Sequence, residues 1–353
     1  MPARRGLAAV AALALAGCSH SAPFTAPDAT GTSPFAGLVP ARLTYDAGAD
    51  IHPQWTGDGA ALLYSFERHL PGAEFPDRCL GALPPTGGQR LAEWCWPGHE
   101  EWTRRDGIEA GALGNDGTLF FVHHYGAGEK QPNPHRGSAY VADSAGIGTP
   151  TRLLDMLVPH PGASARWDYI LAPVFTAPGT ITGLAAAVRI DQPCPTWGWD
   201  RGYSVLELVR RDLTTPGSME VLARIGRAAF LSWDRSSGRF FFARDGRIET
   251  VPTEGGEAAM VWQVPRSADR EDAALTGLAA AAGRLVISQR WSEHGEVRNQ
   301  LGVLASDGTI QEIASSVNYP RWGRLALSPD GRRLAVERRD ANGERDLYLY
   351  ELP

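Results

Sequence analysis

Lysine is almost absent from the sequence. Lys130 is the only lysine among the 34 basic residues, and all the others are arginines. These residues form no basic run or stripe, and the formal net charge is −6. Proteins that bind nucleic acid do so through clustered positive charge, so the sequence predicts no nucleic-acid partner.

No apolar run is long enough to predict a membrane-spanning helix. The apolar stretch Leu7–Leu15 is short and follows the cationic pair Arg4 and Arg5, a layout typical of a secretory signal. The next residues, Leu15–Cys18, resemble the lipobox of bacterial lipoproteins. In that family the residue matching Cys18 receives a diacylglycerol and becomes the new N-terminus. The alternative is an ordinary signal peptide with an unrelated cysteine.

The resemblance implies that residues 1–18 are a lipoprotein signal peptide. Residues 19–38 are rich in Ser, Thr, Ala, Pro and Gly and predict a flexible tether, which leaves 39–353 as the folded domain. We therefore expect an exported, monomeric domain that contacts a membrane only through its lipid anchor. By the sorting rules of proteobacterial lipoproteins, Ser19 favours the outer membrane.

Only four cysteines occur, and three remain when Cys18 is set aside. Cys79, Cys95 and Cys194 allow three different single bridges. Cys79 and Cys95 flank an expected hairpin, so their pairing is favoured in an oxidising compartment, and three free thiols are the alternative. No CxxC motif occurs, so neither a redox motif nor a zinc ribbon is supported.

The linear motifs of common enzymes are missing. There is no GxSxG, the stretch after His99 lacks the second histidine of a zincin, and the glycines near Gly126 form neither a dinucleotide fingerprint nor a phosphate-binding loop. We predict no cofactor and no metal, and binding is favoured over catalysis. An enzyme whose site is assembled from scattered loops remains the alternative.

What the sequence does contain is a repeat. Leu327–Val336 and Trp55–Tyr64 both read as an apolar residue, a tight turn ending in glycine, and an apolar strand. The pattern recurs four more times, and each unit also carries a second hairpin. Six units of four short strands predict an all-β fold, a six-bladed β-propeller with four antiparallel strands per blade.

The last unit lacks its fourth strand. Ala41–Tyr45 lies before the first unit and has no hairpin partner of its own. We expect it to pair with Asp346–Leu352, so that an N-terminal strand closes the last blade and neither chain end leaves an open sheet edge.

The stretches His52–Phe66 and Ala326–Leu352 resemble the WD40-like (PD40) repeats of TolB-type six-bladed propellers. The resemblance is clear in the first and last units, degenerate between them, and covers about residues 41–353. It implies a periplasmic or surface domain that binds proteins or glycans. It also implies that Asp58 and Asp330 are turn residues and not catalytic ones.

Two long loops between second and third strands predict the working face, because function concentrates in loops on a rigid scaffold. Aromatic residues and arginine are typical of binding hot spots, and aromatic platforms also suit sugars. The alternatives are that the tryptophans fold inward and that the histidines only stabilise a loop. The candidate binding residues of these loops are His123, His124, Tyr125, His135, Trp197, Trp199, Arg201 and Tyr203.

The functional hypothesis is a lipid-anchored propeller that binds a protein or glycan at the cell envelope. The alternative is a lyase, cyclase or hydrolase with its site in the central funnel. Candidate residues there are His52, Arg105 and Asp168. A purely structural envelope component is the third hypothesis.

Overall fold

A computed structural model describes residues 33–35, 37–45, 48–69, 71, 76–95, 107–125, 136–153, 165–189, 205–215, 218–226, 228–265 and 272–353. Cys18 and the predicted signal peptide lie outside these residues. The described part of the chain contains no helix that is long and apolar enough to cross a membrane. Contacts between residues divide the chain into two units, 1–32 and 33–353.

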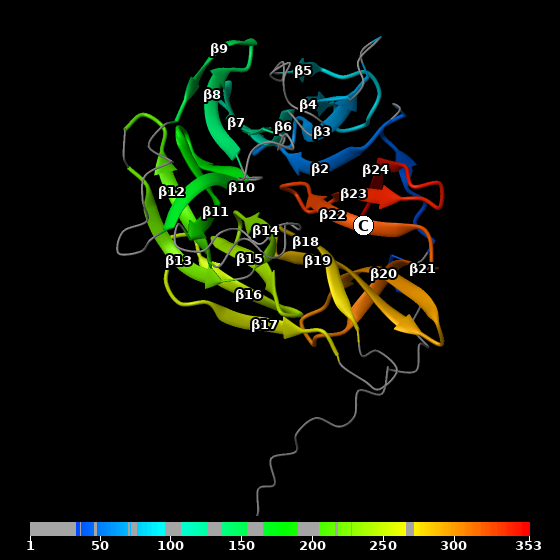
Figure 1. Ribbon diagram of the computed structural model, residues 1–353. Helices are drawn as coiled ribbons and strands as arrows, with labels where there is room; N and C mark the ends of the chain where they lie inside the picture. The colour runs from blue at the N-terminus through cyan, green and yellow to red at the C-terminus, as the bar shows by residue number, and fades with distance from the viewer. Residues whose placement is uncertain are drawn as a thin grey trace, which may run out of the picture. The chain divides into compact units, whose positions relative to one another are not determined.

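Within 33–353, antiparallel sheets are arranged around a central axis as in a β-propeller (Figure 1). Four of the sheets have four strands each. Their strands are β10 (Ala165–Ala177), β11 (Thr180–Arg189), β12 (Val205–Asp212) and β13 (Glu220–Gly226); β14 (Ala229–Asp234), β15 (Arg239–Arg244), β16 (Arg247–Pro252) and β17 (Ala259–Gln263); β18 (Ala274–Ala281), β19 (Arg284–Glu293), β20 (Glu296–Leu304) and β21 (Ile310–Val317); and β22 (Arg321–Leu327), β23 (Arg333–Arg339) and β24 (Arg345–Glu351) with β1 (Ala41–Arg42).

The fifth sheet has eight strands. It contains β2 (Asp50–Trp55), β3 (Leu62–Arg68), β4 (Asp77–Leu83), β5 (Ala92–Trp94), β6 (Gly107–Leu113), β7 (Thr118–Tyr125), β8 (Arg136–Asp143) and β9 (Gly146–Arg152). Two antiparallel runs, β2–β5 and β6–β9, are joined by one parallel pair, Arg78 with Gly107. We use the term strand group for each of these two runs and for each of the four separate sheets. The groups in chain order are β2–β5, β6–β9, β10–β13, β14–β17, β18–β21, and β22–β24 with β1.

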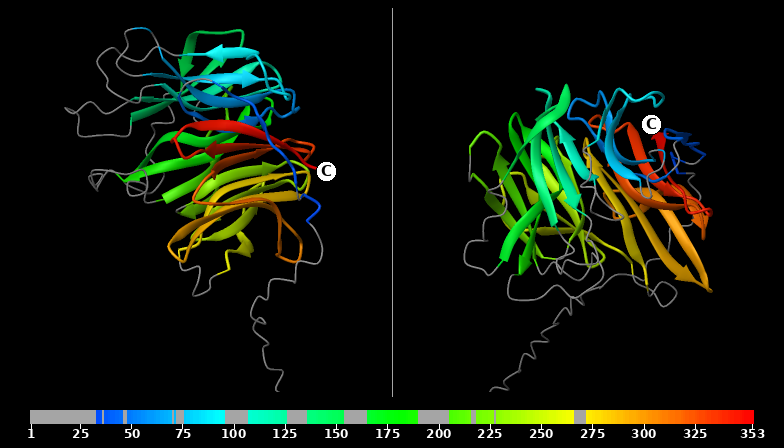
Figure 2. Two further views of the ribbon diagram at one scale, coloured as in Figure 1. Left: turned by 90° about the vertical axis from the view of Figure 1, so that its right-hand side faces the viewer. Right: turned by 45° about the horizontal axis from the view of Figure 1, so that its top comes forward.

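The expected closure between the two ends of the domain is present. β1 pairs antiparallel with β24, with Ala41 opposite Leu349 and Arg42 opposite Tyr348. The backbone N–H of Leu43 continues the ladder by donating to the carbonyl of Leu347 over 2.8 Å. In Figure 2 the blue N-terminal segment lies beside the red C-terminal strands. The edge of β24 is therefore covered.

The packed unit begins before the predicted boundary at residue 39. Phe35 is only 6% exposed and belongs to the same core cluster as Val336 and Tyr350. The hydroxyl of Ser33 donates to the carbonyl of Glu312 over 2.7 Å. The segment from Ser33 to Leu38 thus belongs to the folded unit and not to a tether, because an apolar side chain within it is buried.

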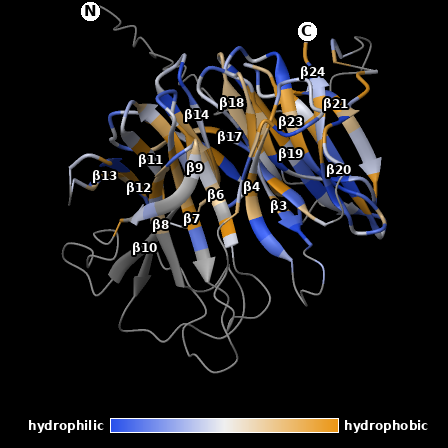
Figure 3. Cartoon of the chain, turned by 90° about the horizontal axis from the view of Figure 1, so that it is seen from above, coloured by the Kyte–Doolittle hydropathy of each residue, from blue (hydrophilic) through white to orange (hydrophobic). Residues whose placement is uncertain are grey.

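Apolar strands form these sheets because each one is covered by a neighbouring strand group. On β15, Phe240 and Phe242 are fully buried. On β24 the residues from Asp346 to Tyr350 are all buried. The alternation of residue types in this stretch therefore does not separate a solvent-exposed face from a buried one. Figure 3 shows hydrophobic colour mainly along the strands and hydrophilic colour mainly near their ends.

Hydrophobic clusters join neighbouring groups in sequence order. One cluster, for example, contains Phe120, Ile181 and Val209 and lies between β6–β9 and β10–β13. Another contains Trp55, Ala335 and Leu347 and joins the last group back to β2–β5. Burial of apolar surface between groups is thus continuous around the axis.

Two tryptophans repeat the same link between neighbouring groups. The indole N–H of Trp94 on β5 donates to the carbonyl of Ser144, in the turn between β8 and β9, over 2.9 Å. The indole N–H of Trp262 on β17 donates to the carbonyl of Gly308, in the turn between β20 and β21, over 3.0 Å. Each bond satisfies a turn carbonyl of the next group.

The predicted disulfide is present. The sulfur atoms of Cys79 on β4 and Cys95, which follows β5, are 2.03 Å apart. Glu93 lies beside them, and donor atoms of the three residues come within 4.8 Å of one another. Because both sulfurs are used in the disulfide, neither is a thiolate ligand for a metal.

Candidate functional site

The first strand of each group lines the central axis, and we call these the inner strands. They are β2, β6, β10, β14, β18 and β22. At corresponding positions each carries one extra residue relative to the second strand of its group, and β10 carries two more, between Trp167 and Ile170 and between Phe175 and Ala177. The extra residues fall between Ile51 and Gln54, Ile108 and Ala110, Leu171 and Val174, Ala229 and Ser232, Leu275 and Gly277, and Trp322 and Leu325.

These β-bulges change the direction of the inner strands close to the axis. His52, Ala172 and Phe230 lie within three of them and have positive φ angles of 58°, 46° and 58°. Residues other than glycine adopt such angles uncommonly, so the surrounding packing must hold them there. The bulges mark a common level along the channel.

A cavity of about 670 Å³ extends from this level to the turns that join each inner strand to the second strand of its group. We call this side the turn end of the channel. The lining residues come from within the segments 52–57, 110–116, 172–178, 228–235, 278–281 and 324–329. Turn residues in the lining, such as Asn115, Pro178 and Pro329, are exposed, so the cavity reaches solvent at the turn end.

The walls of the cavity are mainly apolar. Val174, Phe175, Leu231, Leu325 and Leu327 are among the lining residues. Trp55 is 8% exposed and lines the cavity, and its indole N–H donates to the carbonyl of Ala326 over 3.1 Å. A cavity of this size with mainly apolar walls has the character of a ligand-binding site.

The two carboxylates among the lining residues bond within the fold. Asp116 accepts the backbone N–H of Thr118 over 3.0 Å. Asp234 accepts both the N–H and the hydroxyl of Ser236 and, at 3.1 Å, the N–H of Gly283 in the next group. Burial acts to raise the pKa of Asp234, but these hydrogen bonds outweigh it and the pKa is lowered. Asp234 is therefore an ionised bridge between two strand groups.

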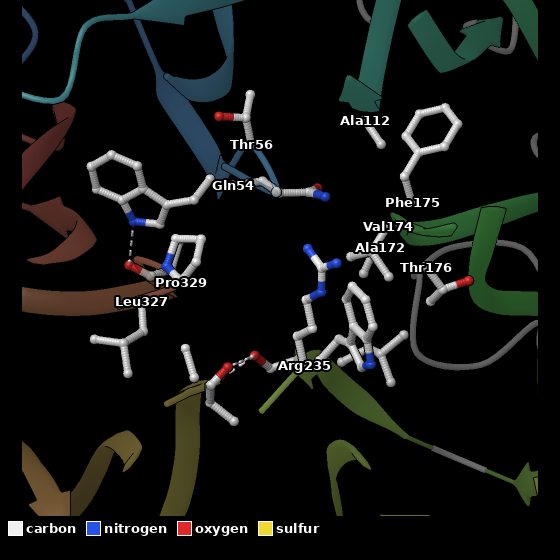
Figure 4. Close-up of a pocket in the computed structure, with 18 of the residues that line it drawn as sticks. Gln54, Thr56, Ala112, Ala172, Val174, Phe175, Thr176, Arg235, Leu327 and Pro329 are labelled. Carbon is white, nitrogen blue, oxygen red and sulfur yellow. Dashed lines mark hydrogen bonds between the residues drawn. The ribbon is translucent and has the colours of Figure 1, made fainter. Parts of the chain in front are cut away.

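Arg235 differs from these carboxylates. Its side chain extends from the end of β14 into the cavity (Figure 4). Among the described residues, none forms a hydrogen bond or an ion pair with its guanidinium group. Within the described ranges, the cavity thus combines mainly apolar walls with one guanidinium group that is paired with no carboxylate.

A buried glutamate lies behind the inner strands where the last group meets the first. Glu337 on β23 is 8% exposed, and its carboxylate accepts the backbone N–H groups of His52 and Arg324. Arg345 approaches it to 3.6 Å. Burial raises the pKa of Glu337, and the two arginines oppose that shift. Glu337 thus ties two of the bulges together.

The aspartates of the repeated turn have the structural role that the family resemblance implies. Asp58 accepts the hydroxyl of Thr56 over 2.7 Å and the N–H of Ala60 over 2.9 Å. Asp330 makes the matching bonds, to the hydroxyl of Ser328 and to the N–H of Arg332. These bonds lower the pKa of both aspartates and fix the turns.

One histidine predicted for a solvent-exposed loop is placed differently. His123 lies on β7, is fully buried, and meets the ring of Tyr140 edge-on at 6.4 Å between centroids. The prediction of a loop here is wrong because β7 continues to Tyr125 and pairs with β8, with His124 opposite Gly137. The backbone of His124 and Tyr125 is therefore strand, and their side chains lie outside the described residues.

The other predicted site residues are placed only in part. His52, a predicted funnel residue, is among the residues that line the cavity. The backbone of Asp168 belongs to β10, and its side chain lies outside the described residues. Arg105, His135, Trp197, Trp199, Arg201 and Tyr203 also lie outside them.

The turn end of the channel was not among the sites predicted from the sequence. Arg235 and Gln54 were not among the candidates, because each belongs to a short turn or an inner strand that reads as scaffold. The repeated turn is the sequence signal that could have indicated this site. A residue that directly follows an inner strand lies in such a turn, and these turns surround the mouth of the channel.

The fold and the cavity define a β-propeller with a central site. No family model matches the chain, and no curated protein matches it. Among solved structures, a luciferin-regenerating enzyme superposes with a TM-score of 0.51 at 11% identity, over 89% of this chain and 96% of that one. A gluconolactonase from Xanthomonas campestris gives 0.50 at 14% identity, over 90% of each chain. A structure described as a TolB from Agrobacterium tumefaciens gives 0.45 at 13% identity, over 88% and 93%. At these identities the likeness is one of fold.

Proposed function

We propose that this chain is a binding protein of the cell envelope, whose propeller receives an apolar part of a protein partner at the turn end of its channel. The observation that carries the proposal is the cavity, which reaches solvent and has apolar walls formed by inner strands of the successive groups. Apolar side chains that enter such a pocket contribute much of the binding energy of protein interfaces. Apolar walls favour a protein segment over a glycan, which needs many polar partners.

The envelope location rests on the sequence. The proposal is that residues 1–18 direct export and that Cys18 carries a lipid, which tethers the propeller to a membrane. The disulfide between Cys79 and Cys95 supports an oxidising compartment. Mass spectrometry of the mature N-terminal peptide tests it: a diacylated Cys18 is expected, and an unmodified N-terminus beyond Cys18 contradicts lipid anchoring.

We further infer that each strand group is one blade, which gives a six-bladed propeller of the TolB type. The support is that every group has a bulged inner strand at the channel and that hydrophobic clusters join neighbouring groups. The eight-stranded sheet then consists of two blades linked by the single pair Arg78 and Gly107.

A capture experiment with a filled cavity tests the binding function. The full chain with a C-terminal tag is purified from envelope extract after mild cross-linking. Val174→Trp places an indole in the cavity, and Val221→Trp makes the same exchange on β13, the outer strand of the same sheet. We expect the wild type and Val221→Trp to retain a common protein partner and Val174→Trp to lose it.

Equal melting temperatures for the two variants show that the loss is local. Retention of the partner by a folded Val174→Trp contradicts the proposed site. Release of the partner by glycosidase treatment of the extract indicates a glycan instead of a protein.

A further inference from the structure

Arg235 is a charged residue of the cavity for which the described part of the chain offers no hydrogen-bond or ion-pair partner. It follows β14 directly, is exposed, and extends into the cavity (Figure 4). Within the described part of the chain, no carboxylate lies within ion-pair distance of its guanidinium group. Asp234, its neighbour in sequence, uses its oxygens for Ser236 and Gly283. Asp116 on the rim bonds to its own turn.

The arginines near the channel have other roles. Arg324 acts on the buried carboxylate of Glu337. Arg284 donates to the carbonyls of Gly331 and Pro353, over 3.2 Å and 2.7 Å. Arg333 lies over the ring of Trp55, 5.0 Å from its centroid. No described residue gives Arg235 such a structural role, so we take its five N–H donors as the groups that a ligand would meet.

The surroundings of Arg235 make it selective for anions. A guanidinium group binds a carboxylate or sulfonate through two parallel hydrogen bonds. Arg235 is exposed, but the mainly apolar walls beside it replace part of the water around such a pair and strengthen the attraction relative to an open surface. They also provide a place for an apolar group attached to the anion. An arginine on a fully hydrated turn would discriminate little between charged and neutral ligands.

We propose that the site binds an apolar group flanked by an anionic group, with the anion paired to Arg235 and the apolar part against the cavity walls. This inference rests on the proposed function, since it defines the chemistry of the partner segment that the same cavity receives. The expected feature of that segment is a carboxylate next to an apolar side chain.

Two fluorescent probes test the inference directly. 1-Anilinonaphthalene-8-sulfonate and N-phenyl-1-naphthylamine share the same aromatic body, and only the first carries a negative charge. Both are titrated into the full chain and into the variants Arg235→Gln and Arg247→Gln. Arg247 is the matched control: it is an exposed arginine on the same sheet, the first residue of β16 after the turn from β15, at the other end of those strands.

We expect Arg235→Gln to weaken the sulfonate probe about tenfold, the usual scale for losing a charged hydrogen-bonding partner, and to leave the neutral probe within twofold. Arg247→Gln should change neither probe. Val174→Trp should remove both probes from the cavity. An equal effect of Arg235→Gln on both probes, or no effect on either, overturns the inference.

The outcome is separate from that of the capture experiment. Loss of charge discrimination with intact partner capture refutes the role of Arg235 and leaves the binding function standing. Discrimination between the probes without partner capture supports the anion site and refutes the protein partner.

Discussion

The side-chain amide of Gln54 donates a hydrogen bond of 2.6 Å to the backbone carbonyl of Pro173. Gln54 lies on β2 and Pro173 on β10, two inner strands that have β6 between them in the order of the groups. In Figure 4 Gln54 projects from β2 toward the cavity. The bond therefore links two groups that share no sheet, across the channel.

Gln54→Leu removes this link and keeps the volume of the side chain. We expect the free energy of unfolding to fall by about 1 kcal/mol, because the carbonyl of Pro173 loses its partner. Urea denaturation measures it. Gln263→Leu, an exposed position on β17, is the control and should change stability little. Equal stability of the two variants would mean that the bond contributes nothing.

Arg42→Ala tests the closure between β1 and β24. Arg42 pairs with Asp346 at 2.8 Å, and the aspartate side chain is only 4% exposed. Burial raises the pKa of Asp346, and the bond from Arg42 opposes that shift. Without Arg42 a buried carboxylate loses its counterion, so we expect the free energy of unfolding, measured by guanidinium denaturation, to fall by about 1–3 kcal/mol.

A second variant tests the cause of that loss. Asp346→Asn in the Arg42→Ala background should recover part of the lost stability, because the amide carries no charge. A double variant no more stable than Arg42→Ala would contradict this account.

Glu337 should make stability depend on pH. Burial raises its pKa in the folded state above the ordinary value of 4.5. The folded protein then keeps this proton to higher pH than the unfolded chain, so the contribution of Glu337 to stability falls as the pH rises from 4.5 through the folded-state pKa.

Melting temperatures measured against pH for the wild type and Glu337→Gln test this. The difference should change across that window in the sense that the wild type loses stability relative to the variant, and it should be flat above and below. Glu351→Gln, an exposed site on β24, controls for the removal of one carboxylate. A constant difference between wild type and Glu337→Gln at every pH rules out the titration.

Trp262→Phe tests the link from β17 to the next group. The exchange keeps an aromatic ring but removes the N–H that bonds Gly308, so we expect a loss of about 1 kcal/mol. Trp94→Phe should behave alike, because Trp94 makes the same bond to Ser144. Met260→Leu, exposed on the same strand as Trp262, is the control. If chemical denaturation gives Trp262→Phe the same free energy of unfolding as Met260→Leu, the indole hydrogen bond does not contribute to stability.

Reduction of the disulfide should lower the free energy of unfolding by about 3 kcal/mol, the scale for closing a loop of this length. The measurement is denaturation with and without dithiothreitol. A Cys79→Ala, Cys95→Ala double variant should be insensitive to the reductant. Non-reducing peptide mapping should recover peptides of Cys79 and Cys95 linked together, and recovery of Cys194 in that link would contradict the pairing.

The strand repeat and the closure could be predicted from the sequence because their signals are local. A glycine turn between apolar strands fixes a hairpin, and Gly59 and Gly331 indeed adopt φ angles of 70° and 71°. The disulfide followed from the same hairpin pattern. Alternating residues near the C-terminus required a partner strand, and Ala41–Tyr45 was the unpaired candidate.

The channel could not be predicted in the same way. An extra residue in an inner strand leaves no mark in composition: Ala172 and Phe230 read as ordinary strand residues, yet both have positive φ. The cavity is formed by segments far apart in sequence, so no single stretch contains it. His123 lies among polar residues that are typical of a loop, yet it is buried within β7. Phe35 was hidden in a segment whose composition is that of a linker.

The pairing of β1 with β24 has a consequence for how the protein is made. Arg42 and Asp346 are 304 residues apart. Synthesis proceeds from the N-terminus, so β1 must wait, unpaired, until nearly the whole chain has been translated. Contacts of such long range form slowly, because the intervening chain must first be ordered. A product of interrupted translation lacks β24 altogether and keeps β1 without its partner. Closure of the ring is therefore a late step that only chains containing β24 complete. A protease that attacks unpaired strands would cleave truncated chains, in which β1 is exposed, in preference to closed ones.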